Sequence, residues 1–138
     1  MKKLIVAALL ALPGSVVLAQ APDVKEWGKE TIRSYEACSF VGTAAKIMNR
    51  VGAEDITKSR NCVDVKVQQA KAAFDAMPQP RKPSASAALK DYYDAWIAAM
   101  RSVPGRLADS SHSSDSAATS TKQRLNELWA RFEIEAGL

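Results

Sequence analysis

The stretch CSFVGTAAKIMNRVGAEDITKSRNC, residues 38–62, carries the chain's only two cysteines at its two ends. Apolar residues before and after it recur at three- and four-residue steps, which is the spacing of one face of a helix. A turn near Arg50–Ala53 would place Cys38 about twelve residues before it and Cys62 about ten after it. At about 1.5 Å of rise per residue, these distances differ by less than one helical turn. We therefore expect a helical hairpin closed by a Cys38–Cys62 disulfide.

Other uses of the two cysteines fit the pattern less well. Structural zinc sites need four ligands in close pairs, whereas this chain offers two separated cysteines and one histidine. The C-x-x-C motif of redox pairs and the C-x-x-C-H motif of covalent haem attachment are both absent. We predict no metal site and no cofactor. Two facing free thiols remain the alternative to a disulfide.

The amino terminus reads MKKLIVAALLALPGSVVLAQ and has the layout of a secretory signal peptide. Lys2 and Lys3 precede an apolar run over residues 4–12, and Val17 and Ala19 suit cleavage after Ala19. The run is shorter than the roughly 20 residues that span a bilayer. We expect a signal peptide over residues 1–19 and one helical domain over residues 20–138, periplasmic or secreted and without a membrane span. A retained amino-terminal anchor is the alternative.

The charge balance gives no indication of nucleic-acid binding. The chain has 19 Lys and Arg against 15 Asp and Glu, a net charge of +4. Removing Lys2 and Lys3 with the signal peptide leaves 17 against 15, or +2. Both signs are interspersed along the chain, and pairs such as Glu26 with Lys29 and Glu30 with Arg33 have the spacing of ion pairs on a helix.

Four segments have helical periodicity: residues 24–51, 54–77, 84–103 and 117–136. Asp23 and Glu26 form a possible capping box at the start of the first segment. Gly52, Pro78 and the Pro104–Gly105 pair are expected to end the first three segments. No convincing strand is predicted, although VDVKV (63–67) alternates. The predicted fold is a small all-α antiparallel four-helix bundle with one intramolecular disulfide.

Two stretches contain the candidate binding residues. In KDYYDAW (90–96), Tyr92 and Trp96 lie four residues apart and should pack in the core, whereas Asp91, Tyr93 and Asp94 would face solvent or a partner. The Ser-rich segment DSSHSSDSAATST (109–121) has few bulky apolar groups, and we expect a mobile loop there. It holds His112, the only histidine. A preorganised catalytic histidine is not expected in such a loop, so His112 is assigned to partner binding.

None of the common catalytic motifs occurs in the chain. There is no Gly-rich phosphate loop, no H-E-x-x-H and no G-x-S-x-G. We therefore predict a non-enzymatic exported protein that binds an unknown protein of the periplasm or cell envelope, such as an inhibitor or immunity-type protein. The alternatives are a small-molecule or haem carrier with its ligand in the bundle core, and an envelope stress or structural protein. The apolar-stripe methionines Met48, Met77 and Met100 are expected to fill the core.

Overall fold

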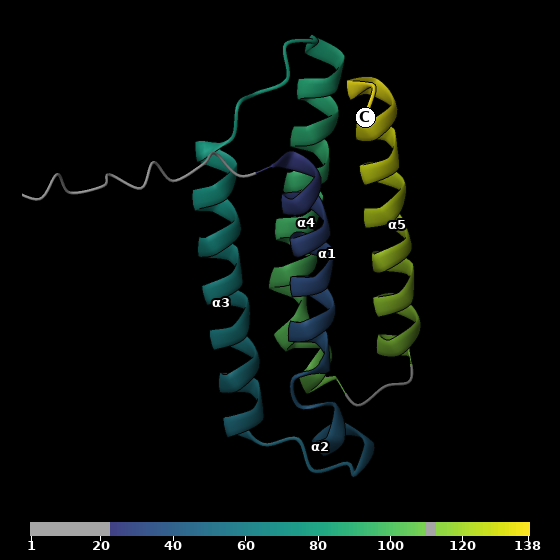
Figure 1. The fold of residues 1–138 in the computed structure, drawn as a ribbon. Coiled ribbons are helices and arrows are strands. Elements are labelled where there is room, and N and C mark those ends of the chain that lie inside the picture. The colour runs from purple at the N-terminus through teal and green to yellow at the C-terminus, as the bar shows by residue number, and fades with distance from the viewer. Residues whose placement is uncertain (1–22, 110–112) are drawn as a thin grey trace, which may run out of the picture.

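A computed structural model describes residues 23–109 and 113–138 of the chain, and this part is helical throughout its regular structure. The helices are α1 (Val24–Phe40), α2 (Thr43–Ile47), α3 (Ala53–Ala76), α4 (Pro83–Ala108) and α5 (Ser113–Ala136). Figure 1 shows the four long helices side by side, alternating in direction, with α2 across one end. The predicted all-α fold is confirmed, and the short fifth helix was not predicted. The expected signal peptide lies outside the described residues.

Helix α1 begins where the sequence predicts but ends earlier. The Asp23 side chain accepts hydrogen bonds from the backbone N–H groups of Lys25 and Glu26, as an N-cap should. The predicted continuation to Val51 is wrong, because Gly42 takes a left-handed conformation with φ of 79°. Leu107 side-chain atoms lie 2.7 and 2.9 Å from where a Cβ of residue 42 would stand. Only glycine satisfies both the conformation and the space.

The start of α3 also corrects a prediction. Gly52, expected to stop the first helix, is instead the N-cap of α3, and its N–H donates to Asp55 Oδ2 at 3.0 Å. The carboxyl end of α3 is as predicted, because the helix stops at Ala76 before Pro78.

Helix α4 runs through Pro104 and Gly105, which were predicted to end it. It starts with Pro83 in its first turn, a position that proline tolerates, and continues to Ala108. The last turn is held by tertiary contacts: Leu107 is buried, and Arg106 Nη2 donates to Tyr35 Oη at 2.9 Å. These contacts offset the backbone hydrogen bond that Pro104 cannot make.

The Ser-rich segment is helical over more of its length than expected. Helix α5 begins at Ser113, whereas the sequence predicted a loop whose end becomes helical only from about residue 117, so residues 113–116 are helical where a loop was expected. Hydroxyls in the first turns of α5 bond back to the carbonyl four residues earlier, Ser120 to Ser116 at 3.0 Å and Thr121 to Ala117 at 2.7 Å. His112 lies outside the described residues.

The core forms where the four long helices meet. Tyr92 and Trp96 are fully buried, as predicted, with Leu89, Met100, Leu125 and Phe132 around them. The Thr31 hydroxyl donates to Gly28 O at 2.7 Å and contacts Tyr92 Oη at 2.6 Å, while Trp96 Nε1 donates to Thr31 O at 2.7 Å. Burial raises the pKa of the Tyr92 phenol, and the Thr31 hydrogen bond only partly offsets this rise.

The methionines divide between core and surface. Met77 and Met100 are buried as expected, whereas Met48 is 56% exposed because the first helical segment ends before it.

Candidate functional site

A groove with a volume of about 490 Å³ lies between α1 and α3. Volumes of roughly 300–1,000 Å³ are usual for small-ligand sites. Its floor consists of Trp27 and Thr31 from α1 and of Ala70 and Ala73 from α3. Because both α3 residues are alanines, they leave space opposite the indole of Trp27. We call this hollow the α1–α3 groove.

The floor of the groove is rigid. The Trp27 indole N–H donates to Ala70 O at 3.1 Å, which joins the two helices directly. The indole ring also packs against Phe74 and Tyr92, with centroid distances of 5.5 and 5.8 Å. Its donor is already satisfied, and the 5% of the side chain that is exposed is apolar and aromatic.

The rim of the groove is mainly acidic. Asp23, Glu26 and Glu30 line it from α1, and Lys66 and Gln69 line it from α3. Three carboxylates thus face one ammonium group. As predicted, Glu26 pairs with Lys29, at 2.6 Å.

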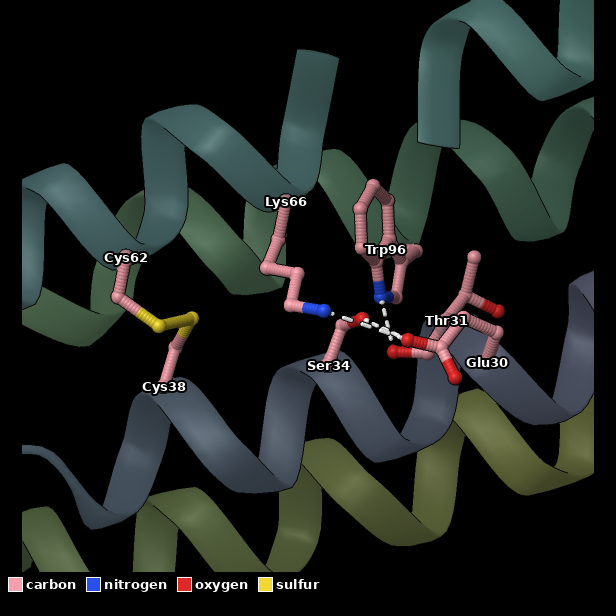
Figure 2. Close-up of a disulfide and its surroundings, with 7 residues drawn as sticks. All are labelled: Glu30, Thr31, Ser34, Cys38, Cys62, Lys66 and Trp96. Atoms are coloured by element: carbon pink, nitrogen blue, oxygen red, sulfur yellow. Dashed lines mark hydrogen bonds and ion pairs between the residues drawn. A yellow bond between two sulfur atoms is a disulfide. The ribbon is translucent and has the colours of Figure 1, made fainter. Parts of the chain in front are cut away.

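The ion pair expected between Glu30 and Arg33 is replaced by one across the groove. Glu30 Oε1 lies 3.3 Å from Lys66 Nζ and accepts from the Ser34 hydroxyl at 3.4 Å (Figure 2).

The disulfide lies at one end of this groove. Cys38 and Cys62 are bonded, with their Cα atoms 5.6 Å apart, which confirms the predicted pairing. Cys38 follows Ser34 by one turn of α1, and Cys62 precedes Lys66 by one turn of α3, as Figure 2 shows. The covalent bond therefore sets the separation of the two helices next to the Glu30–Lys66 pair.

A second unusual surface lies at the α2 end of the molecule. Phe40, Ile47 and Met48 are 73%, 80% and 56% exposed, respectively. They account for three of the six large apolar side chains that are exposed in the described part of the chain, and they fall within nine consecutive residues. We call Phe40, Ile47 and Met48 the apolar end.

The residues predicted on α4 for partner binding differ in their surroundings, with Asp91 and Asp94 exposed and Tyr93 partly buried. Asp91 lies 3.6 Å from Arg131 of α5, and Asp94 pairs with Lys90 of its own helix. Tyr93 is half-buried and stacks on Phe74 of α3, with 4.2 Å between ring centroids. The pKa of the Tyr93 phenol is raised, mainly because the side chain is partly buried. Tyr93 thus belongs to the α3–α4 packing, while the two carboxylates lie beside different partners.

Sequence reasoning missed both the groove and the apolar end. The period of the first segment extends through Met48, which hides the exposure of the residues after Phe40. The groove was missed for another reason. The sequence places Trp27, Glu26 and Glu30 on one helix face, but it does not show that Ala70 and Ala73 lie opposite them until the register of α3 against α1 is known.

Within residues 23–109 and 113–138, no three His, Cys, Asp or Glu side chains are grouped so that they could hold a metal ion. In the same residues, no helix is both long enough and apolar enough to cross a bilayer. The chain matches no protein-family model, no curated protein and no solved structure.

Proposed function

We propose that this chain is an exported, non-enzymatic protein that binds another protein through the apolar end. The observation that carries the proposal is the exposure of Phe40, Ile47 and Met48 at one end of the helices. Single exposed apolar residues are common on protein surfaces, whereas a local concentration of large ones is typical of interaction sites.

Helix α2 supports this proposal because it is held in place without contributing to the core. None of its residues is buried. Lys46 Nζ nevertheless donates to Arg106 O at 3.3 Å and lies 3.2 Å from Asp115 Oδ1, so α2 is attached to the ends of α4 and α5. A segment that is fixed yet presents Ile47 to solvent is suited to contact a partner.

The proposed partner is a folded protein of the exported compartment with an apolar depression and an acidic margin. Arg50 is exposed two residues after Met48 and supplies the matching positive charge. The disulfide fits an oxidising compartment, as the proposed export requires. An inhibitor or immunity-type protein would act in this way.

The packing of the core favours a protein partner over a ligand held between the four helices. Trp96, Tyr92, Met100, Leu89 and Phe132 are each exposed by 1% or less and occupy the centre of the fold. A haem or similar ligand in that position would have to displace several of these side chains.

Site-specific photo-crosslinking in the source cells tests the proposal. Ile47 and Ile134 are both 80% exposed, which makes Ile134 of α5 a matched control. A crosslinker at position 47 should capture one protein that a crosslinker at 134 does not. Burial of one isoleucine is worth about 1.5–3 kcal/mol, or about ten- to a hundredfold in affinity. Binding of the purified captured protein should therefore be about tenfold weaker or worse with Ile47→Glu and unchanged with Ile134→Glu.

Two outcomes would contradict the proposal. One is capture of the same proteins from both positions, which would indicate nonspecific contact. The other is equal affinity of the parent protein and Ile47→Glu for the captured partner, since the apolar end would then lie outside the interface.

A further inference from the structure

We infer that the α1–α3 groove is a binding site for a small organic cation, an ammonium head carried on an apolar or aromatic body. This goes beyond the proposed function, because the groove lies between α1 and α3 and none of its lining residues belongs to the apolar end. The inference depends on the groove's shape, its floor and the charges on its rim.

The floor suits the apolar part of such a ligand. Trp27 is 5% exposed, so only a small part of its ring is accessible from the groove, and its N–H is already bonded to Ala70 O and needs no polar group from a ligand. Ala70 and Ala73 provide a second apolar wall. An aromatic ring or short alkyl chain would displace water from this floor, and burial of its apolar surface would favour binding.

The rim selects the sign of the ligand's charge. Asp23 already accepts two backbone N–H groups at the start of α1, so its charge is largely engaged. Glu26 and Glu30 lie four residues apart on one helix face, and each already contacts a lysine: Glu26 is 2.6 Å from Lys29 and Glu30 is 3.3 Å from Lys66. A ligand cation would have to compete with one of these two lysines.

Glu30 is the residue most open to a ligand's ammonium group. Its contact with Lys66 is 3.3 Å and its hydrogen bond from Ser34 is 3.4 Å, both longer than the 2.6 Å contact of Glu26 with Lys29. Charge-assisted hydrogen bonds of full strength measure about 2.7–2.9 Å. A ligand ammonium group can therefore compete with Lys66 for Glu30 and place its body over Trp27.

Three probes of nearly equal shape test the inference: 3-phenylpropylammonium, 3-phenylpropan-1-ol and 3-phenylpropionate. Binding is followed by NMR through the indole N–H resonances of the disulfide-bonded protein. Trp27 lines the groove, so its indole N–H resonance reports ligand contact there. The ammonium probe should shift the Trp27 resonance saturably, and the carboxylate probe should bind at least about tenfold more weakly.

Variants then assign the charge selection to the rim. Glu26→Gln/Glu30→Gln should weaken binding of the ammonium probe about fivefold or more, given about 1 kcal/mol for an exposed ion pair. Asp94→Asn is the matched control, because Asp94 pairs with Lys90 outside the groove, and it should leave binding unchanged. Circular dichroism at 222 nm verifies that each variant is folded.

Three results would overturn the inference. They are the absence of a saturable change at Trp27, binding of the alcohol or the carboxylate probe as tight as that of the ammonium probe, and full affinity in the Glu26→Gln/Glu30→Gln variant. If the double variant misfolds, the comparison of the three probes on the parent protein still decides. None of these results bears on the apolar end.

Discussion

Two helical glycines should respond in opposite ways to the same substitution. Gly28 lies in α1 against the indole of Trp129, and a Cβ added there would stand 2.3 Å from two carbons of that ring. Gly105 lies in α4, and a Cβ added there meets no atom within 4 Å. Both positions are inside helices, so the backbone effect of Gly→Ala is similar and the difference between the variants measures packing.

The expected magnitudes follow from these distances. Ordinary van der Waals contact begins at 3.4 Å, so Trp129 would have to retreat by 3.4 − 2.3 = 1.1 Å. Trp129 is confined by Tyr92 and Phe132, each 5.0 Å away between ring centroids, and by Trp27 at 6.3 Å. Overpacking of this kind costs about 1–3 kcal/mol, and alanine returns about 0.5–1 kcal/mol of helix propensity. The difference lies between about 0 and 2.5 kcal/mol, and we expect Gly28→Ala to lower the free energy of unfolding by about 1 kcal/mol, near the middle of this range.

The control has the opposite sign. Gly105→Ala replaces glycine by a residue of higher helix propensity and causes no clash, so we expect it to raise the free energy of unfolding by about 0.5–1 kcal/mol. Urea unfolding followed by circular dichroism at 222 nm measures both variants against the parent protein. A Gly28→Ala variant as stable as the parent would show that Trp129 moves aside freely, and the account of the α1–α5 contact would then be wrong.

Two further predictions concern the disulfide and the core. Cys38→Ser removes a crosslink between residues 24 positions apart, which stabilises the fold by about 3.5 kcal/mol in the chain-entropy model. We expect a lower melting temperature in oxidising buffer, with the helical circular dichroism largely retained. An unchanged melting temperature would refute a stabilising role. Burial raises the pKa of the Tyr92 phenol. Above about pH 10 the unfolded chain therefore loses the phenol proton while the folded chain keeps it. The free energy of unfolding should then fall by up to about 1.4 kcal/mol per pH unit. In Tyr92→Phe this alkaline loss should be smaller, as measured by urea unfolding between pH 9 and 11, and an identical pH dependence in the two proteins would contradict the assignment to Tyr92.

The parts of the fold that sequence patterns predicted are those set by local rules. The stripe through Trp27, Thr31 and Tyr35 is buried as expected, and Asp23 caps α1 through its own side chain. The disulfide was predictable because helical rise alone places Cys38 and Cys62 at similar heights on either side of a turn.

The errors occur where a distant contact outweighs a local preference. The first segment keeps its apolar period beyond residue 40, yet Leu107, more than sixty positions away, helps to set the glycine-only turn at Gly42. The same end of α4 explains why the helix passes through Pro104: burial of Leu107 and the Arg106–Tyr35 hydrogen bond reward the additional turn. Local propensity carries no information about these contacts.

The disulfide and the α1–α3 groove both involve α3, the long helix of which few side chains are fully buried. Helix α4 buries nine side chains, whereas α3 buries only Ser59 and Val63. The Ser59 hydroxyl is buried without a hydrogen-bond partner among the described residues, which costs about 1–3 kcal/mol. Few α3 side chains are fully buried, so its position beside α1 depends on the Cys38–Cys62 bond, on the hydrogen bond from Trp27 to Ala70 and on the packing of Phe74 against Trp27.

The small residues Ala70 and Ala73 of α3 keep the α1–α3 groove open. Large side chains on α3 that interdigitated with α1 would fill the space over Trp27. Because the disulfide also joins the two helices, α3 can have the small residues Ala70 and Ala73 opposite Trp27, and the groove stays open. The disulfide acts one turn from Ser34 and Lys66, so it also limits how far the Glu30–Lys66 contact can lengthen or close. The structural role of the cysteines and the proposed binding role of the groove are therefore compatible, because the crosslink supplies the stability that the unfilled α1–α3 contact lacks.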